Sequence, residues 1–247
     1  MNARSHQGRS EGAFTLIELL VSTAITLIIL SILMYVFAGF LDLWGSTSAR
    51  SETFAEARAA LGLMAHELDQ VIPKVGDTVT VTSTPGLGVT PAKSLGFLCK
   101  ASPADQPSGQ NQSDVCAVIY FLSPTNEGGV TGQALYRRLI TSQTVYDRLK
   151  LGSALYTDAT DRTSPYTEMV AQNVVDFQVT LRDASYSVIP PSSDPTQPAG
   201  APCQVEVLLT VISSRGATQY FDPTVSDAQK QKLAAKESRN FTMRHHL

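Results

Sequence analysis

The sequence is poor in cysteine, histidine and charged residues. It has 247 residues, of which three are cysteines and four are histidines. Three cysteines exclude a disulfide-rich scaffold, and the cysteines and histidines are too widely spaced to form a zinc motif. Charged residues make up 17% of the chain, below the roughly 25% of soluble domains. The formal charge of −3 gives no indication of nucleic-acid binding. We therefore expect no metal, no cofactor and no nucleic-acid partner.

One apolar segment accounts for the missing charge. From Leu19 to Leu41 there are 23 consecutive residues without Asp, Glu, Lys or Arg. As a helix this segment would be about 35 Å long, enough to cross a hydrocarbon core of about 30 Å. It is too long for a secretory signal, and no small-residue cleavage site follows it. Arg4 and Arg9 precede the segment, so the positive-inside rule predicts a cytoplasmic N-terminus and an exported remainder.

A carboxylate, Glu18, stands at the start of this segment. At membrane depth it costs on the order of a few kcal/mol unless it is paired, protonated or held at the interface. One interpretation places it among the headgroups near a helix N-terminus, where the helix dipole favours a negative charge. Its neighbours indicate more, because residues 14–18 read Phe-Thr-Leu-Ile-Glu. This string resembles the N-terminal signal of type IV pilins and type II secretion pseudopilins.

The resemblance implies proteolytic processing. In that family a prepilin peptidase of the inner membrane removes a short basic leader and methylates the new N-terminal amine. Here the cut would fall between Ala13 and Phe14, with methylation on Phe14. The family usually has Gly before the cut, but cutting after Gly12 would make Glu18 the sixth mature residue rather than the fifth. We therefore expect a leader at 1–13, a transmembrane and filament-core helix at 14–44, and an extracytoplasmic head at 45–247.

The spacing between the cut and Glu18 has a physical reason. Cleavage creates a cationic amine on Phe14, and the Glu18 carboxylate of a neighbouring subunit can neutralise it when two such helices pack with an axial stagger. In a low dielectric a missing partner leaves a buried charge, so the pair favours one register over all others. We interpret Glu18 as an assembly residue. The expected partners are the prepilin peptidase and methyltransferase, other pilin or pseudopilin subunits, and the inner membrane.

Helical periodicity continues beyond residue 45 as an amphipathic pattern that ends before Pro73. Its apolar residues recur at steps of three and four, and they are Phe54, Ala57, Leu61, Met64, Ala65, Leu68 and Ile72. The charged residues of the same stretch, which we place away from this stripe, are Glu52, Glu56, Arg58 and Glu67. The stripe predicts a helix, extending to about residue 72, that packs on a core.

The remainder of the chain indicates strands. Short β-branched or aromatic-rich runs occupy 78–82, 94–99, 115–122 and 134–140. Apolar and polar residues alternate at 175–182 and 204–211, which predicts two antiparallel partners with their apolar faces on the helix. We also expect a proline-rich surface loop at 183–203, a capped helix at 226–237 and an edge strand at 240–244. The predicted fold class is α+β, with a long N-terminal helix packed on an antiparallel, pilin-like sheet.

Segments of the head carry a second resemblance. The string ALYRRL at 134–139, the strands near 173–183 and 204–211, and a glycine turn at Gly216 look like those of J-type minor pseudopilins. They imply a minor subunit at a filament tip. Ala13 before the cut and the His-Leu ending are similar to the prepilin-like proteins of the Verru_Chthon cassette. Pilus, DNA-uptake and secretion systems stay open as alternatives.

The cysteines leave two alternatives. Cys99 and Cys116 flank one short loop, and outside the cytoplasm they are the pair expected to form a disulfide, with Cys203 left over. The other interpretation is three buried free thiols.

No sequence motif indicates an enzyme. His66-Glu67-Leu68-Asp69-Gln70 begins like a zinc-protease helix, but Gln70 stands where the second histidine must bind the metal, and we place His66 on the solvated side of the helix. Phosphate-loop, dinucleotide and serine-hydrolase motifs are missing from the sequence. We expect no catalytic activity. The alternative function is a single-span, membrane-anchored binding or sensor protein, which predicts no N-terminal processing.

Overall fold

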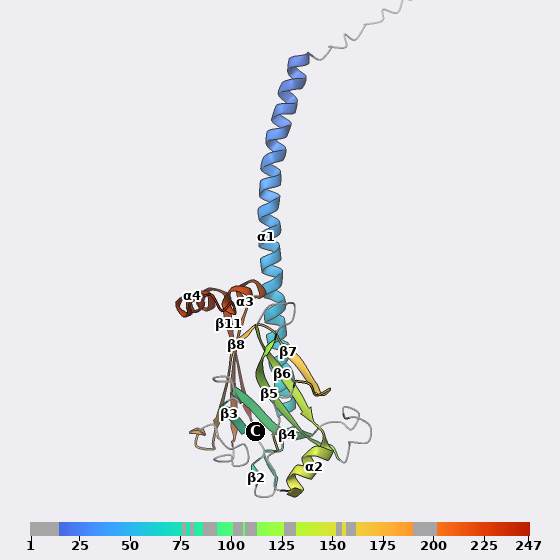
Figure 1. The fold of residues 1–247 in the computed structure, drawn as a ribbon, viewed down its shortest axis with the longest axis vertical. Helices are drawn as coiled ribbons and strands as arrows, with labels where there is room; N and C mark the ends of the chain where they lie inside the picture. Colours follow the sequence, from blue (N-terminus) through green and yellow to red (C-terminus); the bar gives the residue numbers. More distant parts are fainter. Residues whose placement is uncertain are drawn as a thin grey trace, which may run out of the picture. The chain divides into compact units, whose positions relative to one another are not determined.

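The structure is a computed structural model. It describes residues 15–75, 78–79, 82–85, 93–100, 106, 113–125, 132–151, 155–156, 162–189 and 202–247. The chain divides into two compact units, residues 1–47 and residues 48–247. The first helix, α1 (Leu16–Leu68), begins in the first unit and ends in the second (Figure 1).

In the first unit, α1 is apolar and exposed. None of its residues from Leu16 to Leu41 is buried, and α1 is the helix of the described chain that is long and apolar enough to cross a membrane. Its hydroxyl side chains donate hydrogen bonds to carbonyls one turn earlier in the same helix, and they belong to Ser22, Thr23, Thr26 and Ser31. These polar groups therefore have partners without leaving the helix, as an apolar surrounding requires.

In the second unit, the predicted apolar stripe of α1 faces a core. Ala57 and Met64 are fully buried and Leu68 is 1% exposed. The helix ends at Leu68, before the predicted end at Ile72. The reason is a backbone pairing, in which the Ile72 N–H donates to the Leu98 carbonyl at 2.8 Å and the Lys100 N–H donates to the Gln70 carbonyl at 3.1 Å. The segment after the helix thus joins a sheet before Pro73 is reached.

That sheet has five antiparallel strands. In spatial order they are β3 (Thr82–Pro85), β4 (Lys93–Lys100), β5 (Val115–Thr125), β6 (Gly132–Ile140) and β7 (Thr167–Ala171). The strands predicted at 94–99, 115–122 and 134–140 are confirmed. The run predicted at 78–82 is divided between β2 (Thr78–Val79), which pairs with β1 (Lys74–Val75), and the start of β3.

A second sheet has the spatial order β11, β10, β8, β9. Its strands are β8 (Val174–Arg182), β9 (Val188–Ile189), β10 (Gln204–Ile212) and β11 (Ser238–His246). The predicted antiparallel pair is confirmed, with Val207 opposite Val179 and Leu209 opposite Phe177. The predicted edge strand is β11. The capped helix is also confirmed as α4 (Asp227–Glu237), where Ser226 and Gln229 form a capping box.

Two helices were not predicted, α2 (Ser142–Leu151) and α3 (Ser214–Tyr220). The expected turn at Gly216 is wrong, because this residue lies inside α3, where its N–H donates to the Ser213 hydroxyl at 3.1 Å. A side chain there would begin 2.8 Å from Ile212 Cγ1, so close packing accounts for the glycine. Most of the predicted proline-rich loop, residues 190–201, lies outside the described residues.

The five-stranded sheet is covered on both faces. One face joins the α1 stripe and the second sheet in the main core, which includes Phe97, Val118 and Tyr120. The other face packs beneath α2 in a smaller core. Alternate residues of β5 belong to different cores, so this strand is buried on both sides and forms a continuous apolar run in the sequence.

Candidate functional site

Ala13, Phe14 and Glu18 are the residues predicted to take part in processing and assembly, and the structure describes one of them, Glu18. Ala13 and Phe14 lie outside the described residues. Glu18 is in the first turn of α1, which begins at Leu16. Its carboxylate therefore lies at the positive end of the helix dipole.

Thr15 and Glu18 form a reciprocal pair of hydrogen bonds at this helix start. The Thr15 N–H and the Thr15 hydroxyl both donate to Glu18 Oε2, at 3.1 and 3.0 Å, and the Glu18 N–H donates to the Thr15 hydroxyl oxygen at 3.3 Å. This is the capping-box arrangement of a threonine followed three residues later by a glutamate. It gives partners to two backbone donors that a helix N-terminus leaves unpaired. The threonine–glutamate spacing is visible in the sequence, although the prediction for Glu18 concerned assembly and not capping.

The capping box leaves one carboxylate oxygen for another role. Among the described residues, the hydrogen bonds to the Glu18 carboxylate all reach Oε2. Oε1 can therefore accept a further donor, such as an amine, without breaking the cap. Ser22 and Thr26 follow at steps of four residues and lie on the same face of the helix.

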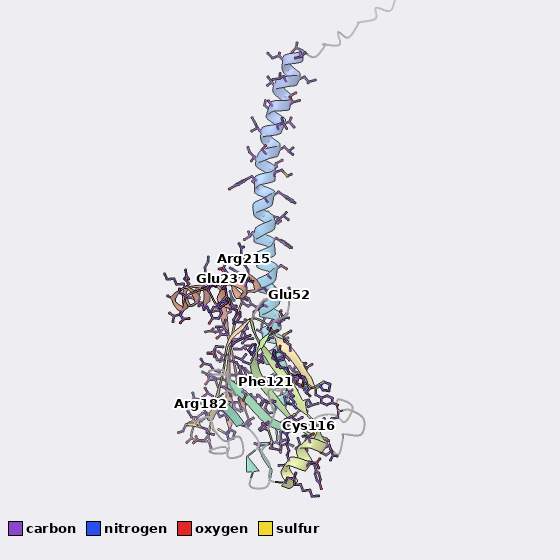
Figure 2. All side chains as sticks on the ribbon, in the orientation of Figure 1. Glu52, Cys116, Phe121, Arg182, Arg215 and Glu237 are labelled. Atoms are coloured by element: carbon purple, nitrogen blue, oxygen red, sulfur yellow. The ribbon has the colours of Figure 1, made fainter. Side chains whose placement is uncertain are left out.

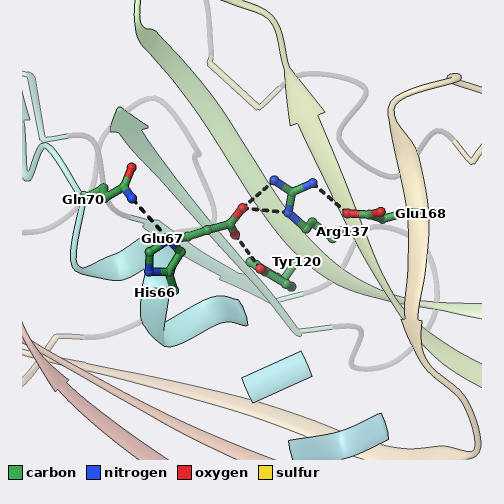
Figure 3. Close-up of polar contacts among 6 residues, drawn as sticks. All are labelled: His66, Glu67, Gln70, Tyr120, Arg137 and Glu168. Atoms are coloured by element: carbon green, nitrogen blue, oxygen red, sulfur yellow. Dashed lines mark hydrogen bonds and ion pairs between the residues drawn. The ribbon is translucent and has the colours of Figure 1, made fainter. Parts of the chain in front are cut away.

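A second polar centre lies inside the head, at the last turn of α1 (Figure 3). Glu67 is 9% exposed. Its Oε2 accepts the Tyr120 hydroxyl at 2.5 Å, and its Oε1 accepts Arg137 Nε at 2.7 Å together with Arg137 Nη2. Arg137 Nη1 donates to Glu168 Oε1 at 2.7 Å. Side chains from α1, β5, β6 and β7 thus meet in one network.

Charge and burial fix the protonation states of this network. Burial, followed by the charge of Glu67 and its hydrogen bond, raises the pKa of Tyr120 far above its usual value. Burial alone would lower the pKa of Arg137, but hydrogen bonding and charge pairing with Glu67 outweigh it and raise this pKa. At neutral pH the tyrosine is neutral and the arginine is charged. The network connects α1 to the five-stranded sheet by paired charges, and this is a structural role.

The burial of Glu67 corrects the prediction from helical periodicity, which placed this residue away from the buried stripe. Its neighbour His66 is exposed, as predicted, and Gln70 lies 3.4 Å from His66 Nε2. A sequence signal for the buried pair was present in the two adjacent cations Arg137 and Arg138, which interrupt the apolar residues of β6. Among the described residues, no group of three or more His, Cys, Asp or Glu side chains could hold a metal ion.

The two cysteines that we expected to form a disulfide are brought together. Cys99 and Cys116 lie directly opposite one another on β4 and β5, both are buried, and no disulfide joins them in this structure. The Leu98 carbonyl and the Lys100 N–H bond to residues 70–72 on one side of β4. Successive residues of a strand direct their backbone N–H and C=O groups to opposite sides, so those of Cys99 face β5. Such a hydrogen-bonded pair has a Cβ separation of about 5.5 Å, whereas a disulfide needs about 3.5–4.5 Å. The disulfide stays a prediction, and its formation requires the two strands to draw closer.

Alkylation tests this prediction. We expect iodoacetamide at about pH 8.5 to modify the half-buried Cys203 in the native protein, and Cys99 and Cys116 only after unfolding. Burial, followed by the charges of Glu67 and Cys116, raises the pKa of Cys99 to about 12, so its folded thiol keeps its proton. Mass spectrometry after unfolding without reductant distinguishes the alternatives. Two further alkylations indicate free thiols, and none indicates the disulfide.

Comparisons with known proteins confirm the resemblance of the N-terminal segment. Residues 8–34 match the family model described as the prokaryotic N-terminal methylation motif. No curated protein matches the chain. Among solved structures, the chain is similar to one from the GspK–GspI–GspJ complex of the type 2 secretion system of enterotoxigenic Escherichia coli. The identity is 11%, the match covers 77% of this chain and 96% of that chain, and the TM-score is 0.39.

Proposed function

We propose that this chain, which carries the prokaryotic N-terminal methylation motif at residues 8–34, is a prepilin-like structural subunit of a type IV filament or type II secretion pseudopilus. We further propose that it is a minor subunit located at the filament tip. The motif is the observation that carries the proposal. A membrane-anchored sensor would account for the apolar helix, but it would not need residues 14–18 in this order.

In this proposal the chain first enters the inner membrane with residues 1–13 in the cytoplasm and the head outside it. A prepilin peptidase then cuts between Ala13 and Phe14 and methylates the amine of Phe14. Arg4 and Arg9 support this orientation through the positive-inside rule. The segment 14–44 would serve as membrane anchor before assembly and as filament-core helix afterwards.

Assembly then depends on Glu18. Moving the helix from lipid into a bundle exchanges one apolar surrounding for another, so hydrophobicity supplies little specificity. The capping box holds the carboxylate at the helix start through Oε2, and Oε1 can accept the Phe14 amine of a neighbouring subunit. A charge pair of this kind stabilises the register in which both groups meet.

The N-terminus of the native protein tests the proposal. Sequencing and intact mass of the protein from its own membranes should give a chain that begins with methylated Phe14. A protein that retains its first 13 residues would contradict the proposal and favour the sensor alternative. A chain that begins with Ala13 would move the cut to the bond after Gly12.

A bulky residue at the cut should block processing. We expect Ala13→Trp to retain the leader in nearly all molecules, because the peptidase must fit a small residue before the scissile bond. Ser10→Trp is the matched control, since it adds the same ring to the leader away from the bond. Leader retention is measured by the mass of the membrane-inserted protein. Normal maturation of Ala13→Trp would show that the cut lies elsewhere.

A further inference from the structure

The C-terminal part of the head is basic although the chain as a whole is acidic. Residues 214–247 contain six Lys or Arg and three Asp or Glu, whereas the whole chain has a net charge of −3. Three of these cations, Lys230, Lys232 and Lys236, belong to α4. The C-terminal acid of α4, Glu237, is already paired with Arg50 at 2.7 Å and accepts the Ser213 hydroxyl at 3.1 Å. Asp227 begins α4, Asp222 lies near Lys230, and Asp176 acts together with Asp227 on Tyr220 at the end of α3.

Helix α4 is an outlying element of the head. None of its eleven residues is buried. It lies beside α3 at one end of the second unit, the end where Arg215 and Glu237 are labelled, and α2 lies at the other end (Figures 1 and 2). A helix with no buried residue leaves most of its surface for another partner.

A groove of about 380 Å³ separates α3 from α4. It is lined by Gln219, Val225, Gln229, Lys232, Leu233 and Lys236. Lys232 and Lys236 are four residues apart and therefore project from the same side of α4. Two ammonium groups and two amide side chains supply hydrogen-bond donors for an anion, and the valine and leucine supply apolar surface beside them. This combination suits a phosphate group attached to an apolar molecule.

The chain itself limits how far this groove can be from a bilayer that holds residues 19–41. Arg50, which binds the end of α4, is nine residues beyond Leu41. Nine residues span at most about 32 Å even in a fully extended chain. The chain connection alone therefore keeps the lysines of α4 near the lipid headgroups.

We propose that α4 and the α3–α4 groove bind the phosphate groups of anionic phospholipids while the subunit is anchored in the membrane. This inference rests on the proposed function, which supplies the anchored state. Juxtamembrane lysines are attracted to anionic lipid surfaces, and the amides and apolar residues of the groove complement a headgroup. The contact would hold the head at the membrane surface and would be given up when the helix leaves the bilayer for a filament.

Hydrogen exchange of the full chain in nanodiscs, one copy per disc, tests this inference. We expect the amides of 227–237 to exchange about fivefold more slowly in discs with about 30% phosphatidylglycerol than in pure phosphatidylcholine, and the difference to vanish in about 0.5 M NaCl. The variant Lys232→Gln/Lys236→Gln should lose the difference. The control Lys100→Gln/Lys150→Gln, which removes two cations elsewhere, should keep it.

Several outcomes would overturn the inference. If the amides of 227–237 exchange equally fast in both lipid compositions, the inference is wrong. Protected amides at Leu19–Leu41 in the same sample would show that the chain is nevertheless anchored in the membrane. Equal protection in phosphatidylcholine with inorganic phosphate would indicate a soluble anion instead of a lipid. Protection of 227–237 that appears only with two copies per disc, and is the same in both lipid compositions, would indicate that a second copy of the chain binds there. Failure of residues 19–41 to insert would instead contradict the proposed function.

Discussion

Replacing Glu18 with alanine should leave membrane insertion and leader cleavage intact and reduce incorporation into filaments by about a hundredfold or more. The loss is large because the Phe14 amine of each neighbouring subunit would enter an apolar bundle without its counter-charge. Breaking a buried pair costs about 3–5 kcal/mol, and each 1.4 kcal/mol corresponds to a factor of about ten in an equilibrium constant. The measurement is the fraction of mature protein that sediments with sheared filaments.

Two further variants separate charge from helix capping at this position. Glu18→Gln keeps an oxygen that can accept the Thr15 N–H, so the helix start is preserved while the charge is lost. It should assemble as poorly as Glu18→Ala. Thr15→Ala removes the capping hydroxyl at a cost of about 1 kcal/mol but keeps the carboxylate, so its effect should be small. Normal assembly of Glu18→Gln would contradict the charge-pairing argument.

Replacing Glu67 with alanine should lower the free energy of unfolding of the head by about 3 kcal/mol, because Arg137 would remain in the structure without its main counter-charge. The Arg137 side chain is 18% exposed and that of Glu67 11%, so water can replace the lost interaction only in part. Tyr120 would lose its acceptor as well. For a unit of this size the melting temperature should fall by about 6–12 °C, measured by calorimetry on the full chain in detergent.

The controls for this prediction use the other members of the network. Glu168→Ala should cost little, since that side chain is 56% exposed and its ion pair is screened by solvent. The triple variant Glu67→Leu/Tyr120→Phe/Arg137→Met replaces all three buried groups by apolar ones, and it should recover most of the lost stability. A Glu67→Ala protein that melts like the parent would show that the network contributes little.

The pH dependence of stability follows from the raised pKa of Tyr120. Below about pH 10, the usual value for tyrosine, both the folded and unfolded chains keep the phenolic proton. Above it the unfolded chain loses this proton first, so the free energy of unfolding should fall as the pH rises further. Tyr120→Phe should remove that part of the alkaline loss. Urea titrations across this range measure it.

Much of the fold could be predicted because its signals are local. Alternating residues identified β8 and β10, and the serine and glutamine at the start of α4 identified its capping box. The helix α3 could not be predicted in this way. It has seven residues, includes Gly216, and depends on the cap at Ser213 and on packing against α4. Its stability comes from tertiary contacts that no short window of sequence contains.

The site was predicted less completely than the fold. The order of residues 14–18 identified Glu18, because several adjacent positions agree with one family. The role of Thr15 was missed because the capping pattern overlaps the processing signal. Glu67 was missed for a different reason. Its partners Tyr120 and Arg137 are 53 and 70 residues away along the chain, and periodicity around α1 cannot show what faces that position.

The burial of β5 on both faces has a consequence for the chain before it folds. Residues 115–122 contain no charged side chain. Before this segment has paired with β4 and β6, it can pair with the same segment of another copy of the chain. The residues next to it oppose such self-association. Asp114 adds a charge before the segment, and Pro124 removes a backbone donor after it. The unfolded polypeptide thus has a residue that opposes aggregation on each side of this uncharged segment.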